Sequence, residues 1–125
     1  MKKVNTNNFK KTLSKFSTGI TVVCVKNNNS IYGKTVNSFN SLSLNPPMVL
    51  FSLGNYSSSI KQFSKTKFLS INILSSKQKK LSDNFALTTP KLENIKFIEG
   101  KYKTVIIPNC IANLECKLID KIKKG

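Results

Sequence analysis

Apolar positions near the N-terminus recur at the spacing of a helix. Phe9, Leu13 and Phe16 are three or four residues apart and would therefore share one helix face. Thr6 and Asn7 precede this face and belong to the residue types that cap helix N-termini. The pattern predicts an N-terminal helix with one apolar face.

From residue 20 onward, short apolar and β-branched runs predominate, and such runs are typical of strands. The polar run 27–30 separates the first two and favours a tight hairpin, because asparagine tolerates left-handed backbone conformations. Stretches 56–65 and 76–86 have helical spacing, whereas residues 88–103 fit neither pattern. The predicted strands are 20–25, 31–39, 48–53, 68–74, 104–107 and 110–119.

Many strands with a few short helices predict an α+β barrel rather than a doubly wound parallel sheet. A chain of 125 residues suits one domain, 1–125, with a single core. No apolar run is long enough to cross a membrane, and the start of the chain lacks a secretory pattern. We therefore expect a cytoplasmic protein that does not enter membranes.

The formal net charge of +16 raises the alternative of a basic, nucleic-acid-binding β-barrel. All the basic residues are lysine, however, so the bidentate fork that arginine offers to guanine and phosphate is missing. The lysines are also scattered along the chain. The lack of arginine and the scatter of the lysines make nucleic-acid binding a distant alternative. The positive charge would favour any anionic ligand.

The three cysteines form no CxxC pair, and histidine is absent. This excludes a zinc site of the usual Cys/His kind and any nucleophile activated by a histidine of this chain. Cys110 and Cys116 are an even number of residues apart and would share one strand face with Leu114. We expect these two residues and Cys24 to be buried, reduced thiols. No metal site is predicted.

Polar side chains crowd the stretch TVNSFNSLSLNPP, 35–47, between two apolar runs. A second polar stretch, GNYSSSIKQF, begins at residue 54, so both flank the same predicted strand, 48–53. The second one places three serines at a helix start, where free amides and hydroxyls can bind phosphate. For any single serine or asparagine, capping of a loop is usually the better explanation. The pair of stretches nevertheless indicates an anion-binding site.

In the order of its motifs, the chain resembles the flavin reductase-like family of FMN-binding split-barrel proteins. The resemblance runs from about residue 9 to residue 125 and implies an α+β fold, a mainly antiparallel split β-barrel with short flanking helices. The matching pieces are FKKTLSKFSTGITVVCV, YGKTVNSFNSLSLNPPMVL, LGNYSSSIKQF, KFLSINIL, KKLSDNFA and CIANLECKLIDKIKKG.

The resemblance implies a site for FMN, with FAD as the alternative. Segment 34–38 would lie along the isoalloxazine ring and segment 55–59 would face the ribityl phosphate, whereas Asn72 and Phe85 match positions bordering the flavin. For these last two we favour packing, which their spacing already explains. The implied cofactor-binding residues are Lys34, Thr35, Val36, Asn37, Ser38, Ser41, Ser43, Asn55, Ser57, Ser58, Ser59, Asn72 and Phe85.

The implied activity is hydride transfer from NAD(P)H, the substrate, to the bound flavin. Family members commonly supply reduced flavin to a separate monooxygenase and form homodimers. No catalytic side chain is predicted. The family pattern continues past Lys124 and Gly125 with Asp, His and another strand, so we expect the domain to be incomplete at its C-terminus. Two alternatives stay open: a non-catalytic FMN-binding protein of the same fold and an inactive truncated remnant.

Overall fold

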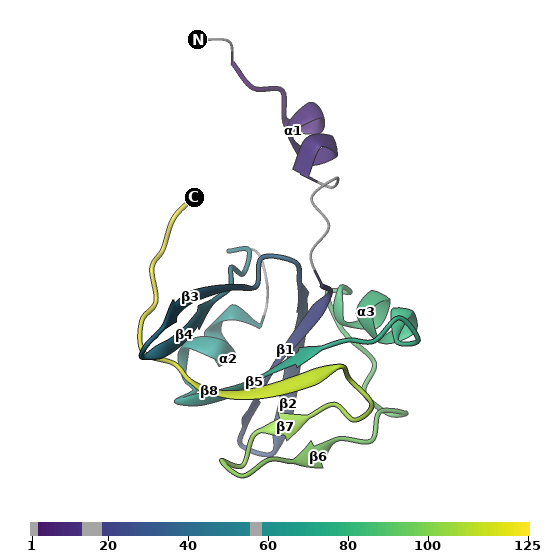
Figure 1. Cartoon of the computed structure of the whole chain (residues 1–125). Coiled ribbons are helices and arrows are strands. Elements are labelled where there is room, and N and C mark those ends of the chain that lie inside the picture. Colours follow the sequence, from purple (N-terminus) through teal and green to yellow (C-terminus); the bar gives the residue numbers. More distant parts are fainter. Residues whose placement is uncertain (1–2, 14–18, 56–58) are drawn as a thin grey trace.

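The computed structural model describes residues 3–13, 19–55 and 59–125. Its described helices are short, and half of its described strands belong to one sheet (Figure 1). The helices are α1 (Thr6–Leu13), α2 (Ile60–Ser64) and α3 (Lys79–Phe85). The strands are β1 (Thr21–Asn27), β2 (Ser30–Val36), β3 (Asn40–Leu44), β4 (Pro47–Leu50), β5 (Phe68–Ile73), β6 (Ile98–Glu99), β7 (Val105–Ile106) and β8 (Ala112–Lys117).

The largest sheet has four strands in the order β2-β1-β5-β8, and each neighbouring pair is antiparallel. Within it, Cys24 of β1 pairs with Gly33 on one side and with Ser70 on the other. The pairs β3–β4 and β6–β7 form two small sheets at the upper left and the bottom of Figure 1. This arrangement confirms the predicted α+β fold, mainly antiparallel with short flanking helices.

Apolar side chains cover both faces of β1, which explains why its sequence is continuously apolar instead of alternating. Phe85 of α3 lies in one cluster and Phe63 of α2 in the other, so each helix seals one face of the sheet. The buried members of the first cluster are Val22, Cys24, Leu74, Phe85, Val105 and Ile107. Those of the second are Val23, Val25, Val36, Phe63, Leu69 and Ile71.

A tight turn joins β1 to β2, as the asparagine run predicts. Asn28 and Asn29 have φ angles of 51° and 66°, the left-handed values that a two-residue turn of type I′ requires. Further along β2, a Cβ on Gly33 would lie 2.5 Å from a ring carbon of Phe85. The glycine therefore lets α3 pack closely on β2.

The N-terminal helix begins one or two residues earlier than predicted. The amides of Asn7 and Asn8 donate to Asn5 Oδ1 at 2.9 and 3.1 Å, so Asn5 is the cap instead of Thr6 or Asn7. No residue of α1 is buried, and Figure 1 shows the helix standing apart from the sheets. Phe16, the last member of the predicted apolar face, lies outside the described residues.

Several predicted strands are shorter in the structure. The stretch 48–53 contributes only the short strand β4, and 110–119 contributes only β8. Because β8 begins at Ala112, the alternation does not extend back to Cys110. Cys110 therefore packs on the first cluster and Cys116 on the second, so the predicted shared face is wrong. All three cysteines are free, as expected, but only Cys24 is fully buried.

Candidate functional site

One serine connects the two polar segments that flank β4. Ser38 follows the end of β2, and its Oγ accepts a hydrogen bond from the amide of Ser52 at 2.8 Å. The same hydroxyl lies 3.3 Å from the Ser52 carbonyl oxygen, to which it donates. Ser38 of the first polar stretch therefore lies beside Ser52, two residues before the second stretch begins. Ser52 itself is not among the site residues that the sequence predicts.

The first three predicted site residues direct their side chains into the protein. Thr35 Oγ1 donates to the carbonyl of Ser82 in α3 at 2.7 Å, and Lys34 Nζ lies 3.4 Å from the carbonyl oxygen of Leu87 just beyond α3. Val36 is buried in the second cluster. This end of β2 therefore offers a ligand mainly its backbone groups.

Other hydroxyls and amides of the first segment face outward. Asn37 and Ser41 are exposed, and Ser43 is half-buried. The pairing of β3 with β4 shifts register between Ser41 and Ser43, which is the geometry of a β-bulge. Because a bulge redirects side chains, both serines remain available to a ligand near the strand edge.

The predicted phosphate segment is only partly described. Ser57 and Ser58 lie outside the described residues. Ser59 precedes α2 and is 8% exposed, with its carbonyl accepting from the amides of Gln62 and Phe63. The side-chain amide of Asn55 donates to the carbonyl of Gly125 at 2.8 Å. Since α2 has only five residues, its dipole contributes little to anion binding.

Asn72 and Phe85 are both 0% exposed. The side-chain amide of Asn72 donates to the Val22 carbonyl at 3.0 Å, and its Oδ1 accepts from the Ile107 amide at 3.0 Å and from Asn113 Nδ2 at 2.7 Å. Asn72 thus ties β1, β5, β8 and the segment after β7 together. That either residue borders a flavin stays a prediction.

The electrostatics of the described residues are dominated by unpaired positive charge. One salt bridge is present among them, between Lys79 and Asp83 at 2.9 Å on the surface of α3. Burial raises the pKa of the Cys24 thiol to about 12, despite a hydrogen bond with Ser70 that lowers it. Cys24 is therefore protonated at neutral pH and cannot act as a nucleophile.

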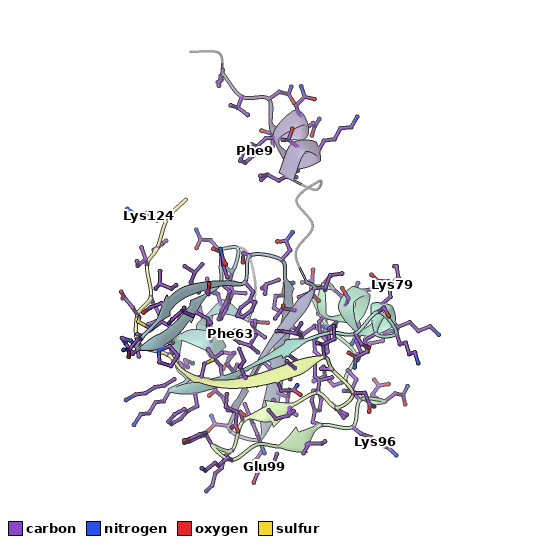
Figure 2. The ribbon with its side chains drawn as sticks, viewed as in Figure 1. Phe9, Phe63, Lys79, Lys96, Glu99 and Lys124 are labelled. Atoms are coloured by element: carbon purple, nitrogen blue, oxygen red, sulfur yellow. The ribbon has the colours of Figure 1, made fainter. Side chains whose placement is uncertain are left out.

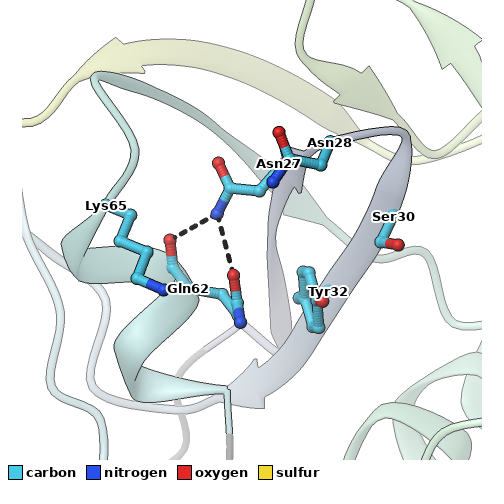
Figure 3. Close-up of a pocket in the computed structure, with 6 residues that line it drawn as sticks. All are labelled: Asn27, Asn28, Ser30, Tyr32, Gln62 and Lys65. Atoms are coloured by element: carbon cyan, nitrogen blue, oxygen red, sulfur yellow. Dashed lines mark hydrogen bonds between the residues drawn. The ribbon is translucent and has the colours of Figure 1, made fainter.

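A polar pocket lies elsewhere, between the β1–β2 hairpin and α2 (Figure 3). Asn27 Nδ2 donates there to the backbone carbonyl of Gln62 at 2.8 Å and to its side-chain oxygen at 3.2 Å. These bonds, drawn dashed in Figure 3, fix α2 on the sheet. The pocket is at the opposite end of β2 from Val36 and so is separate from the two polar segments.

The fold is that of the split-barrel class to which flavin reductases belong. The chain belongs to the family described as flavin reductase like domain, which matches residues 13–125. Similar folds include flavin reductase PheA2 in its native state, with a TM-score of 0.88 and 32% identity over 98% of this chain and 79% of that one. Flavin reductase HpaC complexed with NADP+ has a TM-score of 0.85 and 32% identity, over 97% of this chain and 78% of that one.

Among curated relatives, the chain is 34% identical to the FMN reductase (NADH) SmoA of Agrobacterium fabrum, over 90% of this chain and 65% of that protein. It is 31% identical to the reductase component of the flavin-dependent trigonelline monooxygenase of Acinetobacter baylyi, over 88% of this chain and 36% of that protein. The chain thus spans less than two thirds of either relative. No described helix has the length and apolar character needed to cross a lipid bilayer.

Proposed function

We propose that this protein is an NAD(P)H-dependent flavin reductase whose flavin is FMN, with FAD as the alternative. The observation that carries the proposal is the pair of hydrogen bonds between Ser38 and Ser52, which brings the first polar stretch beside the residues that lead into the second. Membership of the flavin reductase like domain family supports the assignment. Longer relatives that share this domain are named as flavin reductases.

The groups present fit a flavin. Exposed or half-exposed hydroxyls and amides, at Asn37, Ser41 and Ser43, match the polar edge of an isoalloxazine ring. The backbone of segment 34–36 can supply further hydrogen bonds, since its side chains are engaged with α3 or the core. Segment 55–59 would hold the phosphate. The donors are neutral, which suits a ring that must accept and release electrons.

When bound, the flavin supplies the hydride-accepting ring. The protein's part is to place that ring and to exclude water from one of its faces. The two hydrogen bonds of Ser38 fix the proposed ring-binding segment to Ser52, which precedes the proposed phosphate-binding segment in the chain. Thr35 holds the end of β2 on α3. Backbone amides near the pyrimidine side would stabilise negative charge that develops there.

We also propose that the protein has a monooxygenase partner. The relative from Acinetobacter baylyi is named as the reductase component of a flavin-dependent monooxygenase. We also propose a homodimer in the cytoplasm. The exposed apolar residues Phe9, Leu13 and Leu114 support assembly, because they leave apolar surface that a second copy can cover.

Titration of the purified chain with FMN and with FAD tests the proposal directly. We expect saturable quenching of flavin fluorescence. With free flavin present, we also expect oxidation of NADH or NADPH, followed as loss of the near-ultraviolet absorbance that the reduced nicotinamide has and the oxidised nicotinamide lacks. Binding without oxidation would instead favour a non-catalytic FMN-binding protein or an inactive remnant. A folded sample that binds no flavin contradicts the proposal.

A further inference from the structure

Two aromatic rings lie against each other where the turn between β6 and β7 meets the large sheet. The ring of Phe68, the first residue of β5, is stacked on that of Tyr102 in the turn, with centroids 5.3 Å apart and an interplanar angle of 16°. Lys67 Nζ lies 5.7 Å from the centroid of the Phe68 ring. Lys101 Nζ lies 5.9 Å from the centroid of the Tyr102 ring. Each ring therefore has a second ring and an ammonium group beside it, at distances typical of cation–π contacts.

The register of the sheet adds a third lysine, Lys117 of β8. It pairs with Phe68 across the β5–β8 ladder, so the two side chains lie on the same face of the sheet. Glu115 is two residues earlier in β8 and therefore also lies on this face. Figure 1 shows β6 and β7 directly below β5 and β8, where this face meets the turn. The aromatic–lysine patch consists of Lys67, Phe68, Lys101, Tyr102 and Lys117.

Several hydrogen bonds fix the turn that carries Tyr102. The amide of Tyr102 and the amide before it donate to the Glu115 carboxylate at 2.9 Å each. The Gly100 amide donates to the Thr104 carbonyl at 2.8 Å, and the Lys103 amide donates to the Gly100 carbonyl at 3.0 Å. Lys103 has a φ angle of 61°, a left-handed value that closes the turn. The patch is therefore in place before a partner binds, which reduces the conformational entropy lost on binding.

The patch is positively charged and faces solvent. Its three lysines are exposed, and Tyr102 is 52% exposed. None of the three forms a salt bridge with a carboxylate of the described residues. Glu115 adjoins the patch, but its carboxylate already accepts three hydrogen bonds from the turn. Glu99 is exposed on β6, and Figure 2 shows it at the bottom of the molecule with its side chain directed into solvent. Three ammonium groups thus adjoin one carboxylate.

We propose that the aromatic–lysine patch is a docking surface for an acidic face of a partner protein. Its ammonium groups complement clustered carboxylates and would speed the encounter by electrostatic attraction. The exposed ring of Tyr102 adds the aromatic contact area that is enriched in protein interfaces. Single-stranded nucleic acid fits the patch less well, because the two rings stack on each other and leave less aromatic face for a base. This inference rests on the proposed monooxygenase partner and identifies the surface on which it docks.

The test uses poly-L-glutamate as an acidic probe and the full chain at low salt. In Lys67→Gln/Lys101→Gln/Lys117→Gln, we expect the Kd for the probe, measured by titration calorimetry, to rise about fivefold, because three charges leave the docking surface. Tyr102→Ser removes one stacked ring and should raise this Kd about twofold. The matched control Lys77→Gln/Lys80→Gln/Lys96→Gln makes the same change in net charge outside the patch and should raise it less than about twofold.

Three results would overturn the inference. The first is an equal loss of affinity in both triple variants, which would mean that only net charge matters. The second is a wild type that does not bind the probe. The third is tighter binding of a thymidine oligonucleotide that Tyr102→Ser abolishes, which would assign the patch to nucleic acid. The substitutions lie outside the proposed flavin segments, so flavin binding should stay unchanged in all variants. Failure with the probe in a chain that binds flavin therefore overturns this inference and leaves the proposed function standing.

Discussion

At the scale of residues, three side chains that are predicted to border a flavin have hydrogen-bond partners within the protein. Thr35, Ser38 and Asn55 contact backbone atoms of Ser82, Ser52 and Gly125 respectively. Redirecting such a group toward a ligand would leave its present partner unsatisfied, which costs roughly 1–3 kcal/mol where the partner is buried. These residues therefore contribute by placing segments of chain against one another.

The best-satisfied polar side chain, Asn72, carries a prediction about stability. Asn72→Ala removes the acceptor used by the Ile107 amide and by Asn113, and leaves the buried amide without a partner. We expect the free energy of unfolding to fall by about 2–4 kcal/mol, measured by urea denaturation. The exposed Asn94→Ala serves as the control and should change it by less than about 0.5 kcal/mol. An equal, small effect of both substitutions would show that the network around Asn72 contributes little.

At the scale of elements, one carboxylate organises the turn between β6 and β7. Glu115 of β8 accepts from the amides of Lys101 and Tyr102 at 2.9 Å each and from Thr104 Oγ1 at 2.7 Å. A Cβ on Gly100 would lie 2.6 Å from this carboxylate, so the glycine leaves room for it. The turn is thereby attached to the edge strand of the large sheet.

Glu115 should make this attachment dependent on pH. Desolvation raises its pKa, but the hydrogen bonds from Thr104 and from backbone amides together outweigh it and lower the pKa below the usual 4.5. A lowered pKa in the folded state means that the ionised carboxylate stabilises the fold above about pH 4.5, and that this stabilisation is lost as the pH falls through the folded pKa.

Replacement of this carboxylate tests the dependence. We expect Glu115→Gln to reduce the free energy of unfolding by about 1 kcal/mol at pH 7, because charged acceptors make stronger hydrogen bonds than amides. The gap between variant and wild type should close as the pH falls from 4.5 through the lowered pKa of Glu115, as chemical denaturation at several pH values would reveal. Glu93→Gln, on an exposed loop residue, is the control. A gap that stays constant over this range would contradict the assigned role.

At the scale of the whole molecule, α1 carries an apolar face that the described parts of the chain leave largely exposed. Phe9 and Leu13 are 52% and 53% exposed, and no residue of the helix is buried. Full burial of one such side chain against a partner would stabilise the complex by roughly 1.5–3 kcal/mol. This gain favours association with a second copy, in line with the proposed homodimer.

Substitutions on α1 test that role. Phe9→Ser/Leu13→Ser should weaken self-association by about tenfold or more in Kd, measured by sedimentation or by light scattering after gel filtration. Lys3→Ser/Lys10→Ser changes as many exposed residues of the same region and should leave the dissociation constant nearly unchanged. A wild-type chain that is monomeric at all concentrations would contradict the proposal, as would a double apolar variant that dimerises like the wild type.

Local features of the fold could be predicted because their causes are local. The run at 20–25, the period of two at 68–74 and the left-handed turn at Asn28 and Asn29 depend on neighbouring residues and on backbone preferences. The order of motifs likewise sufficed to identify the family and the two polar segments. The ends of β4 and β8 could not be placed, since strand length depends on which partner strand continues alongside.

The sequence by itself therefore determined the fold class, the family and the polar segments that flank β4. Only the tertiary structure decided where the side chains of those segments point. The partners of Thr35, Ser38 and Asn55 include backbone carbonyls, which every residue type supplies. Such acceptors leave no signature in the sequence, so the contacts of Ser38 with Ser52 and of Asn55 with Gly125 emerge only when distant parts of the chain pack together.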